Sequence, residues 1–407
     1  MKLRIIRVQS CLFVVCCWLS VGIQAADEPR VLTPSPSSFE SLSRFTGLLD
    51  ALQRNYVQPS RIDAGQNTTA ALRAFIRSVD PEADLLTPDE AAATNAFANG
   101  SADIGLRFIL RGDYPTIISP RDDSPAQDAG LLAGEQIIAI DKTSLFQARR
   151  FDVEQLLHGP PNSRVTLRVL DPATSAIRDL HLLRARPGAS SSVTLKFLDK
   201  HIAYCRVPEF TVPVVESLRA AMVQSKDEGM ASVILDLRNN AGGAFEAAQV
   251  AASMFLPKEA PIVALEYAHP SQRATFVSDE GKKFIMPLAV LVNAGTAGEA
   301  ELFAAALQDN KRARLVGGKT FGRGFLVASA TLADGSVLTM PTAYYKRPSQ
   351  EMFQGSGLIP DVFIDLPRQN ERLIERIGFS TFQWPSHRTQ VQATDLPLVK
   401  AMFLLTR

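Results

Sequence analysis

A short turn rich in small residues lies where a catalytic nucleophile is usually held. Residues 293–301 read NAGTAGEAE, between the strand-like run PLAVLV and the helix-like run LFAAALQDN. A buried strand followed by such a turn exposes one side chain at the top of a sheet, and the amides at the start of the next helix can stabilise an oxyanion. The pattern indicates acyl-transfer chemistry, but Gly298 stands where a hydroxyl would be most useful.

A second turn could give a backbone donor to the same chemistry. In DLRNNAGG, Asp236 ends a strand-like run, and Gly242 and Gly243 precede a helix-like run. Adjacent glycines either hold an oxygen anion on their amides or only allow a tight strand-to-helix turn, and both interpretations stay open. The five histidines occur singly along the chain, which argues against a His/Asp triad.

The composition is that of an ordinary globular protein of two or three domains. The chain has 407 residues, 46% of them hydrophobic, and a formal charge of +1. The absence of a basic excess argues against a nucleic-acid partner. No cluster of metal-ligand residues stands out, so we expect neither a metal nor another cofactor.

The N-terminus has the pattern of a secretory signal peptide. Lys2, Arg4 and Arg7 precede the apolar run CLFVVCCWLSVG, and Ala25 is a plausible cleavage edge. An uncleaved anchor is the alternative, although the run is shorter than the roughly 20 residues that span a bilayer. Removal of residues 1–25 leaves no membrane span and a single cysteine, Cys205, which we expect to be a buried structural thiol.

The pattern of predicted secondary structure changes several times along the chain. Helical spacing of apolar residues dominates early, short strands with glycine turns follow, and a long region then alternates strands with helices, which predicts a parallel or mixed sheet covered by helices. The expected segments are a signal peptide (1–25), a linker (26–37), a helical region (38–98), a β-rich module (101–185), an α/β core (190–366) and a helical tail (367–407).

These segments resemble the carboxyl-terminal processing peptidases, or tail-specific proteases, in order and in motif. The run ISPRDDSPAQDAGLLAGEQIIAID is similar to their PDZ module. The runs VILDLRNNAGG, ALQDNKRARLVGGKTFGRG and GSGLIPDV look like their peptidase core. The resemblance implies an α/β multidomain fold with a helical region, a PDZ module at 101–185 and a mixed-sheet core of the ClpP/crotonase-like type. It also implies a Ser/Lys peptidase that works outside the cytoplasm, most commonly in a periplasm.

The family's catalytic residues are missing from the matching positions. Its nucleophile turn typically reads Ser-Ala-Ser-Ala-Ser-Glu, and the middle serine maps to Gly298. Its general base is the lysine of Thr-Phe-Gly-Lys-Gly, which maps to Arg323, and a glutamine four residues beyond maps to Val327. Glycine has no nucleophile, a guanidinium cannot be poised as a neutral base, and valine cannot orient one.

Other residues near these positions bear on whether any activity survives. By resemblance, the amides of Gly242 and Gly243 and the N–H of Glu299 are oxyanion donors, but the Glu299 carboxylate would oppose a developing negative charge. Thr296 and Lys319 could form a substitute Thr/Lys pair. Side chains two residues apart on a turn point in different directions, so we do not expect Thr296 to replace a nucleophile at position 298.

The PDZ module is the expected peptide-binding part. PDZ domains add an extended peptide as a strand and capture its carboxylate on backbone amides. The resemblance places the capture loop and receiving strand, and the facing helix, at Ile104, Gly105, Leu106, Arg107, Phe108, Val153, Leu156 and Leu157.

The resulting hypothesis is a secreted pseudopeptidase that binds peptide C-termini or a partner protein, such as an active relative. The alternative is an active serine-type or Thr/Lys endopeptidase that processes C-terminal segments of envelope proteins. A third hypothesis is self-association through the C-terminal helix LPLVKAMFLL.

Overall fold

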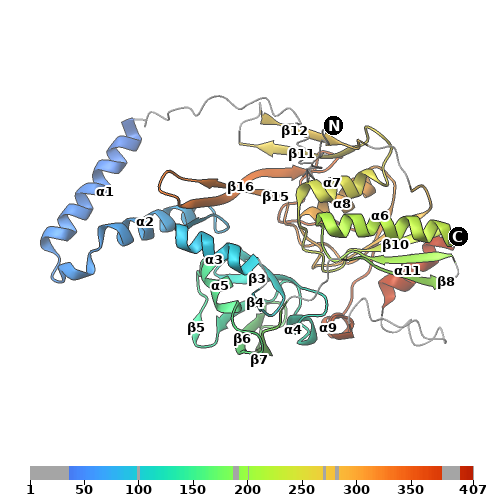
Figure 1. Cartoon of the computed structure of the whole chain (residues 1–407), viewed down its shortest axis with the longest axis horizontal. Helices are drawn as coiled ribbons and strands as arrows, with labels where there is room; N and C mark the ends of the chain where they lie inside the picture. Colours follow the sequence, from blue (N-terminus) through green and yellow to red (C-terminus); the bar gives the residue numbers. More distant parts are fainter. Residues whose placement is uncertain are drawn as a thin grey trace, which may run out of the picture. The chain divides into compact units, whose positions relative to one another are not determined.

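The computed structural model describes residues 36–98, 101–186, 192–199, 201–268, 272–279, 284–377 and 395–406 (Figure 1). The expected signal peptide and most of the expected linker lie outside these residues. The chain divides at Thr69 into two compact units, which are described separately. Among the described residues, no helix is both long enough and apolar enough to cross a membrane.

The first unit is helical, as predicted. Its described elements are α1 (Pro36–Asn55), the 3-10 turn η1 (Pro59–Arg61) and the start of α2 (Ala64–Val79). Helix α1 begins inside the segment expected to be a linker.

The second unit opens with the rest of α2, strand β1 (Asp84–Leu86) and helix α3 (Pro88–Ala98). Helix α3 begins at Pro88, directly after Thr87. The amide of Thr87 donates to Glu90 Oε2 at 3.0 Å, and the amide of Glu90 donates to Thr87 Oγ1 at 3.3 Å. This reciprocal cap satisfies two backbone donors at the helix start.

The PDZ module folds as a six-stranded antiparallel sheet with two short helices. The sheet order is β2-β3-β4-β6-β7, and β5 pairs with β4. Its elements are β2 (Leu106–Arg111), β3 (Tyr114–Pro120), α4 (Pro125–Asp128), β4 (Gln136–Ile140), β5 (Thr143–Ser144), α5 (Arg150–Leu157), β6 (Arg164–Asp171) and β7 (Ala176–Leu183).

The core contains a six-stranded sheet in the order β17-β14-β13-β10-β9-β8, parallel except for β8 at one edge. Helices α6, α7 and α8 pack on one face, and α11 packs on the other (Figure 1). The elements are β8 (Thr194–Asp199), β9 (Ile202–Arg206), α6 (Val212–Asp227), β10 (Ser232–Asp236), α7 (Phe245–Ser253), β13 (Leu288–Val292), α8 (Glu299–Asp309), β14 (Arg314–Gly317), β17 (Val362–Phe363) and α11 (Leu396–Leu405).

A second, antiparallel sheet joins distant parts of the chain. Strand β16 (Val337–Lys346) pairs along one edge with β15 (Phe325–Thr331) and along the other with β1 and β11 (Pro261–Tyr267), while β12 (Ala274–Val277) extends β11. The alternation of strands and helices predicted one parallel or mixed sheet for the core, and thus for β11. The structure places it in this second sheet, because its partner β16 lies about 80 residues further along the chain, where local periodicity gives no signal.

Helix α9 (Arg368–Ile377) follows the core in sequence but packs on the PDZ module. Arg372 donates to Glu135 Oε1 at 2.6 Å and to Asp171 Oδ2 at 3.2 Å, and both carboxylates are buried. Arg368, one turn earlier, also donates to Asp171. The C-terminal segment is therefore tied to the PDZ module by charged hydrogen bonds.

Candidate functional site

The structure brings together three loops around Gly298. Gly298 has φ 60° and ψ −124° and caps the start of helix α8. A Cβ placed on Gly298 would lie 3.2 Å from Arg323 Nη1 and 3.3 Å from the Ala241 carbonyl oxygen. The expected nucleophile and base positions are thus neighbours in space, and the Gly242–Gly243 turn lies beside them.

Glu301 holds these loops in place. Its buried carboxylate accepts the amides of Gly298 at 3.1 Å, Gly322 at 2.7 Å and Arg323 at 2.8 Å, and the Thr320 hydroxyl also donates to it. Burial raises the pKa of Glu301 to about 7, although these hydrogen bonds favour the ionised form. One sequence signal could have pointed to Glu301: a glutamate three residues after a helix cap is typical of a residue that bonds the cap's amide.

The Arg323 side chain is half-buried, and its guanidinium lies over the Phe325 ring, with Cζ 5.2 Å from the ring centroid. Among the described residues, the guanidinium makes no hydrogen bond or ion pair. Val327, at the position of the orienting glutamine, lies on β15 opposite Pro341 with 37% of its surface exposed.

The Glu299 carboxylate covers the glycine turn. Its Oε2 accepts the Gly243 amide at 2.9 Å, and its Oε1 accepts the Tyr345 hydroxyl at 2.8 Å. Gly242 has φ 106°, a conformation that strains any residue with a Cβ, and such a Cβ would lie 2.2 Å from Glu299 Oε2. Burial and the adjacent Glu299 both raise the Tyr345 pKa.

Both glycine amides that were expected to serve an oxyanion already donate within the chain. The Gly242 amide donates to Asn240 Oδ1 at 2.9 Å, and the Gly243 amide donates to Glu299. In the described arrangement, an incoming oxyanion would have to displace these acceptors.

The two possible surrogates occupy different environments. Thr296 is fully buried, and its hydroxyl donates to the Leu237 carbonyl at 2.8 Å while accepting the Asn293 amide at 3.1 Å. Lys319 is exposed. Both hydrogen-bonding functions of the Thr296 hydroxyl are therefore engaged by the backbone.

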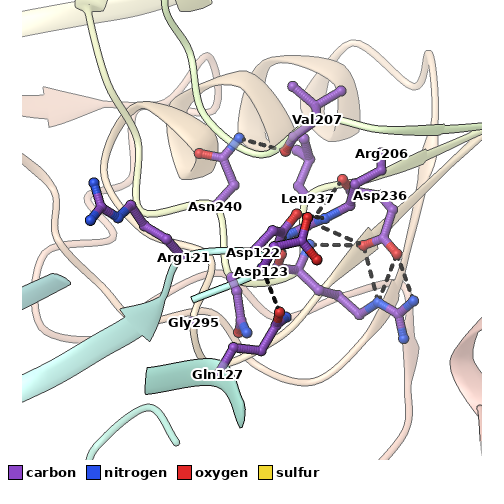
Figure 2. A network of polar contacts seen from close by, with 12 residues as sticks. Arg121, Asp122, Asp123, Gln127, Arg206, Val207, Asp236, Leu237, Asn240 and Gly295 are labelled. Atoms are coloured by element: carbon purple, nitrogen blue, oxygen red, sulfur yellow. Dashed lines mark hydrogen bonds and ion pairs between the residues drawn. The ribbon is translucent and has the colours of Figure 1, made fainter. Parts of the chain in front are cut away.

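A buried ionic network lies beneath the turns and reaches the PDZ module (Figure 2). Arg206 donates from Nε to Asp122 Oδ2 at 2.9 Å and from Nη2 to Asp122 Oδ1 at 2.8 Å. Asp236 binds Arg238, with Oδ2 2.6 Å from Nη2. Burial opposes ionisation of Asp236, but the Arg238 charge and hydrogen bonds outweigh it and lower the Asp236 pKa. Asn240 Nδ2 donates to the Val207 carbonyl at 3.0 Å, which anchors the glycine turn to the same region.

The PDZ strands β2 and β3 pack on the site itself. Ile109 and Ile118 form a buried cluster with Ala297 and Phe325 of the core. Arg111 lies over the Phe321 ring at 4.8 Å and donates to the Gly322 carbonyl at 3.3 Å. The PDZ module and the Gly298 turn thus share one interface.

The residues expected to line the peptide groove belong to the module's own core, and some of the edge backbone has partners within the chain. Five of the expected groove residues are buried in the module's own apolar cluster, namely Ile104, Leu106, Phe108, Val153 and Leu157. A sixth, Leu156, packs against this cluster. The Leu110 amide on β2 donates to Glu82 Oε1, and Arg150 Nη2 donates to the Phe108 carbonyl at 3.4 Å.

The capture loop and the strand arginine have partners as well. The Gly105 amide donates to the Asp103 carboxylate at 2.9 Å. Arg107 pairs with Glu209 of the core at 3.3 Å. Backbone groups expected to meet a peptide therefore have intramolecular partners.

The remaining ionisable candidates are structural. Cys205 is buried as predicted, and burial raises its pKa to about 12. Asp309 pairs with Arg347. His269 and His387 lie outside the described residues. Within the part of the chain that the structure describes, no group of three His, Cys, Asp or Glu side chains could hold a metal ion.

A PDZ module on an α/β core with these two turns defines the class of PDZ-containing peptidase folds. The model of Peptidase family S41 matches residues 201–364, and that of the PDZ domain matches residues 116–171. The chain is 30% identical over 311 residues to the carboxyl-terminal-processing protease of Synechocystis sp., covering 74% of this chain and 72% of that protein. It is 28% identical over 350 residues to the chloroplastic C-terminal processing peptidase of Tetradesmus obliquus, covering 80% and 75%.

A solved structure has the same fold. The photosystem II D1 C-terminal processing protease superposes with a TM-score of 0.67 at 26% identity, covering 84% of this chain and 97% of that one. The chain belongs to the carboxyl-terminal-processing protease family, peptidase family S41.

Proposed function

We propose that this protein is a secreted pseudopeptidase that keeps the tail-specific-protease scaffold and binds peptide or protein C-termini instead of cleaving them. The observation that carries the proposal is the arrangement at Gly298. The nucleophile position has no side chain, the Arg323 guanidinium lies 3.2 Å from where its Cβ would be, and Glu299 binds the Gly243 amide. The nucleophile and the base are therefore replaced by other residues, and one oxyanion donor is already bonded to Glu299.

The active-enzyme alternative has less support. A Thr296/Lys319 pair needs a hydroxyl free to be deprotonated by the lysine, whereas the Thr296 hydroxyl donates to Leu237 and Lys319 is exposed. Loss of the Leu237 hydrogen bond would leave a buried carbonyl without its partner, which opposes that rearrangement.

We propose a periplasmic location, on the basis of the N-terminal charged and apolar pattern and the single cysteine that follows it. The proposed partners are the C-termini of unfolded or incompletely assembled proteins. An active relative of the same family, whose substrates this chain would hold, is a second proposed partner.

The test uses residues 26–407 with unfolded casein as the substrate and mass spectrometry as the readout, beside Thr296→Ala and Lys319→Ala variants. We expect no cleavage by any of the three, and binding of a fluorescent peptide with a free C-terminus. Cleavage by the unmodified chain that Thr296→Ala abolishes would refute the pseudopeptidase proposal. Absence of any peptide binding would refute the binding half.

A further inference from the structure

The hairpin that follows the site is almost devoid of charge. From Gly324 to Tyr345 the only charged residue is Asp334, at the turn. All side chains from Val327 to Thr331 on β15 are exposed. Natural edge strands are usually protected by charged residues, prolines or a covering element, and an unprotected one favours strand addition.

The outer edge of β15 is open among the described residues, since β15 pairs only with β16. The Leu332 amide donates to the Ser336 carbonyl, which sets the alternation of bonded and non-bonded pairs in this hairpin. The backbone groups of Val327, Ser329 and Thr331 therefore point away from β16. Pro341, which has no N–H, lies opposite Val327 at a position where none is needed.

Arg323 lies two residues before β15, and its guanidinium forms no ion pair within the part of the chain that the structure describes. The nearby carboxylates have other partners, because Glu301 binds three amides and Glu299 binds Gly243 and Tyr345. The more deeply buried Arg206 and Arg238 both bind carboxylates. A guanidinium stacked on an aromatic ring with its donors unused is well suited to bind a planar carboxylate.

The direction of β15 joins these two features. β15 runs away from Arg323, so a peptide added antiparallel to β15 would run toward Arg323 and end there. The seven residues of β15 correspond to about 23 Å of extended chain.

We propose that the core binds the C-terminal segment of an extended, uncharged peptide as an added strand on β15, with its terminal carboxylate on Arg323. This inference rests on the proposed peptide-binding function and places the binding on β15 instead of β2. The supporting contrast is that β2 already binds Glu82 at Leu110 and Arg150 at Phe108, whereas no described side chain bonds the outward backbone groups of β15.

The test measures fluorescence anisotropy of an N-terminally labelled peptide of about eight alternating valine and threonine residues, with either a free or an amidated C-terminus. Residues 26–407 are compared with Arg323→Gln. We expect both the substitution and the amide cap to weaken binding roughly ten- to hundredfold, and Arg323→Gln to be indifferent to the cap. Thermal unfolding confirms that Arg323→Gln is folded.

A second pair of variants tests the backbone. Ser329→Pro removes an outward amide and should weaken binding at least about tenfold, while the matched Ser329→Ala keeps the amide and should change it little. Normal binding by both Arg323→Gln and Ser329→Pro would overturn this inference and leave the proposed function intact. Failure of the unmodified chain to bind this peptide, although it binds the peptide of the earlier test, would overturn this inference alone, and failure with both peptides would overturn the proposed binding function too. A dimer in sedimentation that Ser329→Pro dissociates would show that a second copy, not a peptide, covers β15.

Discussion

Restoring the three catalytic residues should not restore much cleavage while Glu299 remains. In the variant Gly298→Ser, Arg323→Lys, Val327→Gln, the Gly243 amide would still donate to the Glu299 carboxylate at 2.9 Å. Loss of one oxyanion donor typically lowers the turnover rate by about 10²–10³-fold. A fourth change, Glu299→Ala, frees that amide and removes a negative charge from the place where another develops. The fourfold variant should therefore cleave about 10²–10³ times faster than the threefold variant.

The assay follows cleavage of unfolded casein by mass spectrometry, with the threefold and fourfold variants side by side. Glu299→Gln in the same background is the matched control, because an amide oxygen can still accept from Gly243 but has no charge. Slow cleavage by the Gln version and fast cleavage by the Ala version would show that occupation of the amide is the obstacle. Equal rates for the threefold and fourfold variants would refute the reasoning.

The fold of each variant needs its own control. Removal of the Glu299 carboxylate leaves the buried Tyr345 hydroxyl without its acceptor, which costs about 1–3 kcal/mol. Tyr345→Phe added to the fourfold variant should recover part of that stability without changing the order of the cleavage rates.

Three further predictions concern stability and reactivity. Burial raises the pKa of Glu375 from its usual 4.5 to about 7, so the stability that Glu375 contributes is present below pH 4.5 and is lost as the pH rises through 7. In urea unfolding, the free energy of unfolding of the unmodified chain should fall by about 3 kcal/mol between these limits, and Glu375→Gln should escape that loss. Parallel pH profiles for the two proteins would contradict this prediction. Arg206→Met should lower the free energy of unfolding by about 3–5 kcal/mol, because it leaves the Asp122 carboxylate without its partner. The matched change Arg168→Met breaks an exposed pair of similar geometry and should leave the unfolding midpoint nearly unchanged. Cys205 should resist a maleimide reagent near neutral pH until the protein unfolds, and rapid labelling of the folded chain would contradict its burial.

The elements around the site could be predicted from local pattern, and their long-range partners could not. The strand-turn-helix units at β10–α7 and β13–α8 follow from apolar runs that are broken by small residues. The contact between Gly298 and Arg323 followed from the family resemblance at a spacing of 25 residues, since no periodicity connects them. The placement of β11 depends on β16, a partner that only the folded chain reveals.

The side chains that bond the backbone groups of the site were the hardest part to predict from sequence. The charge of Glu299 could be read as an obstacle to catalysis, but the hydrogen bond from Gly243 depends on the rotamer that Tyr345 helps to fix. Likewise, a PDZ-like β2 could be predicted, but its edge is bonded by Glu82, from a loop that precedes the module, and by Arg150 of α5, which also binds Glu82. Such contacts join residues that have no shared local pattern.

The Glu301 carboxylate separates the shape of this site from its chemistry. It holds the start of α8 and the loop that ends at Arg323 through the backbone amides of Gly298, Gly322 and Arg323, so these contacts use no side chain at positions 298 and 323. Mutations at those two positions could therefore accumulate during evolution without collapse of the scaffold. A backbone frame of this kind can keep its shape while the side chains that it presents, and therefore the ligands that it can bind, change.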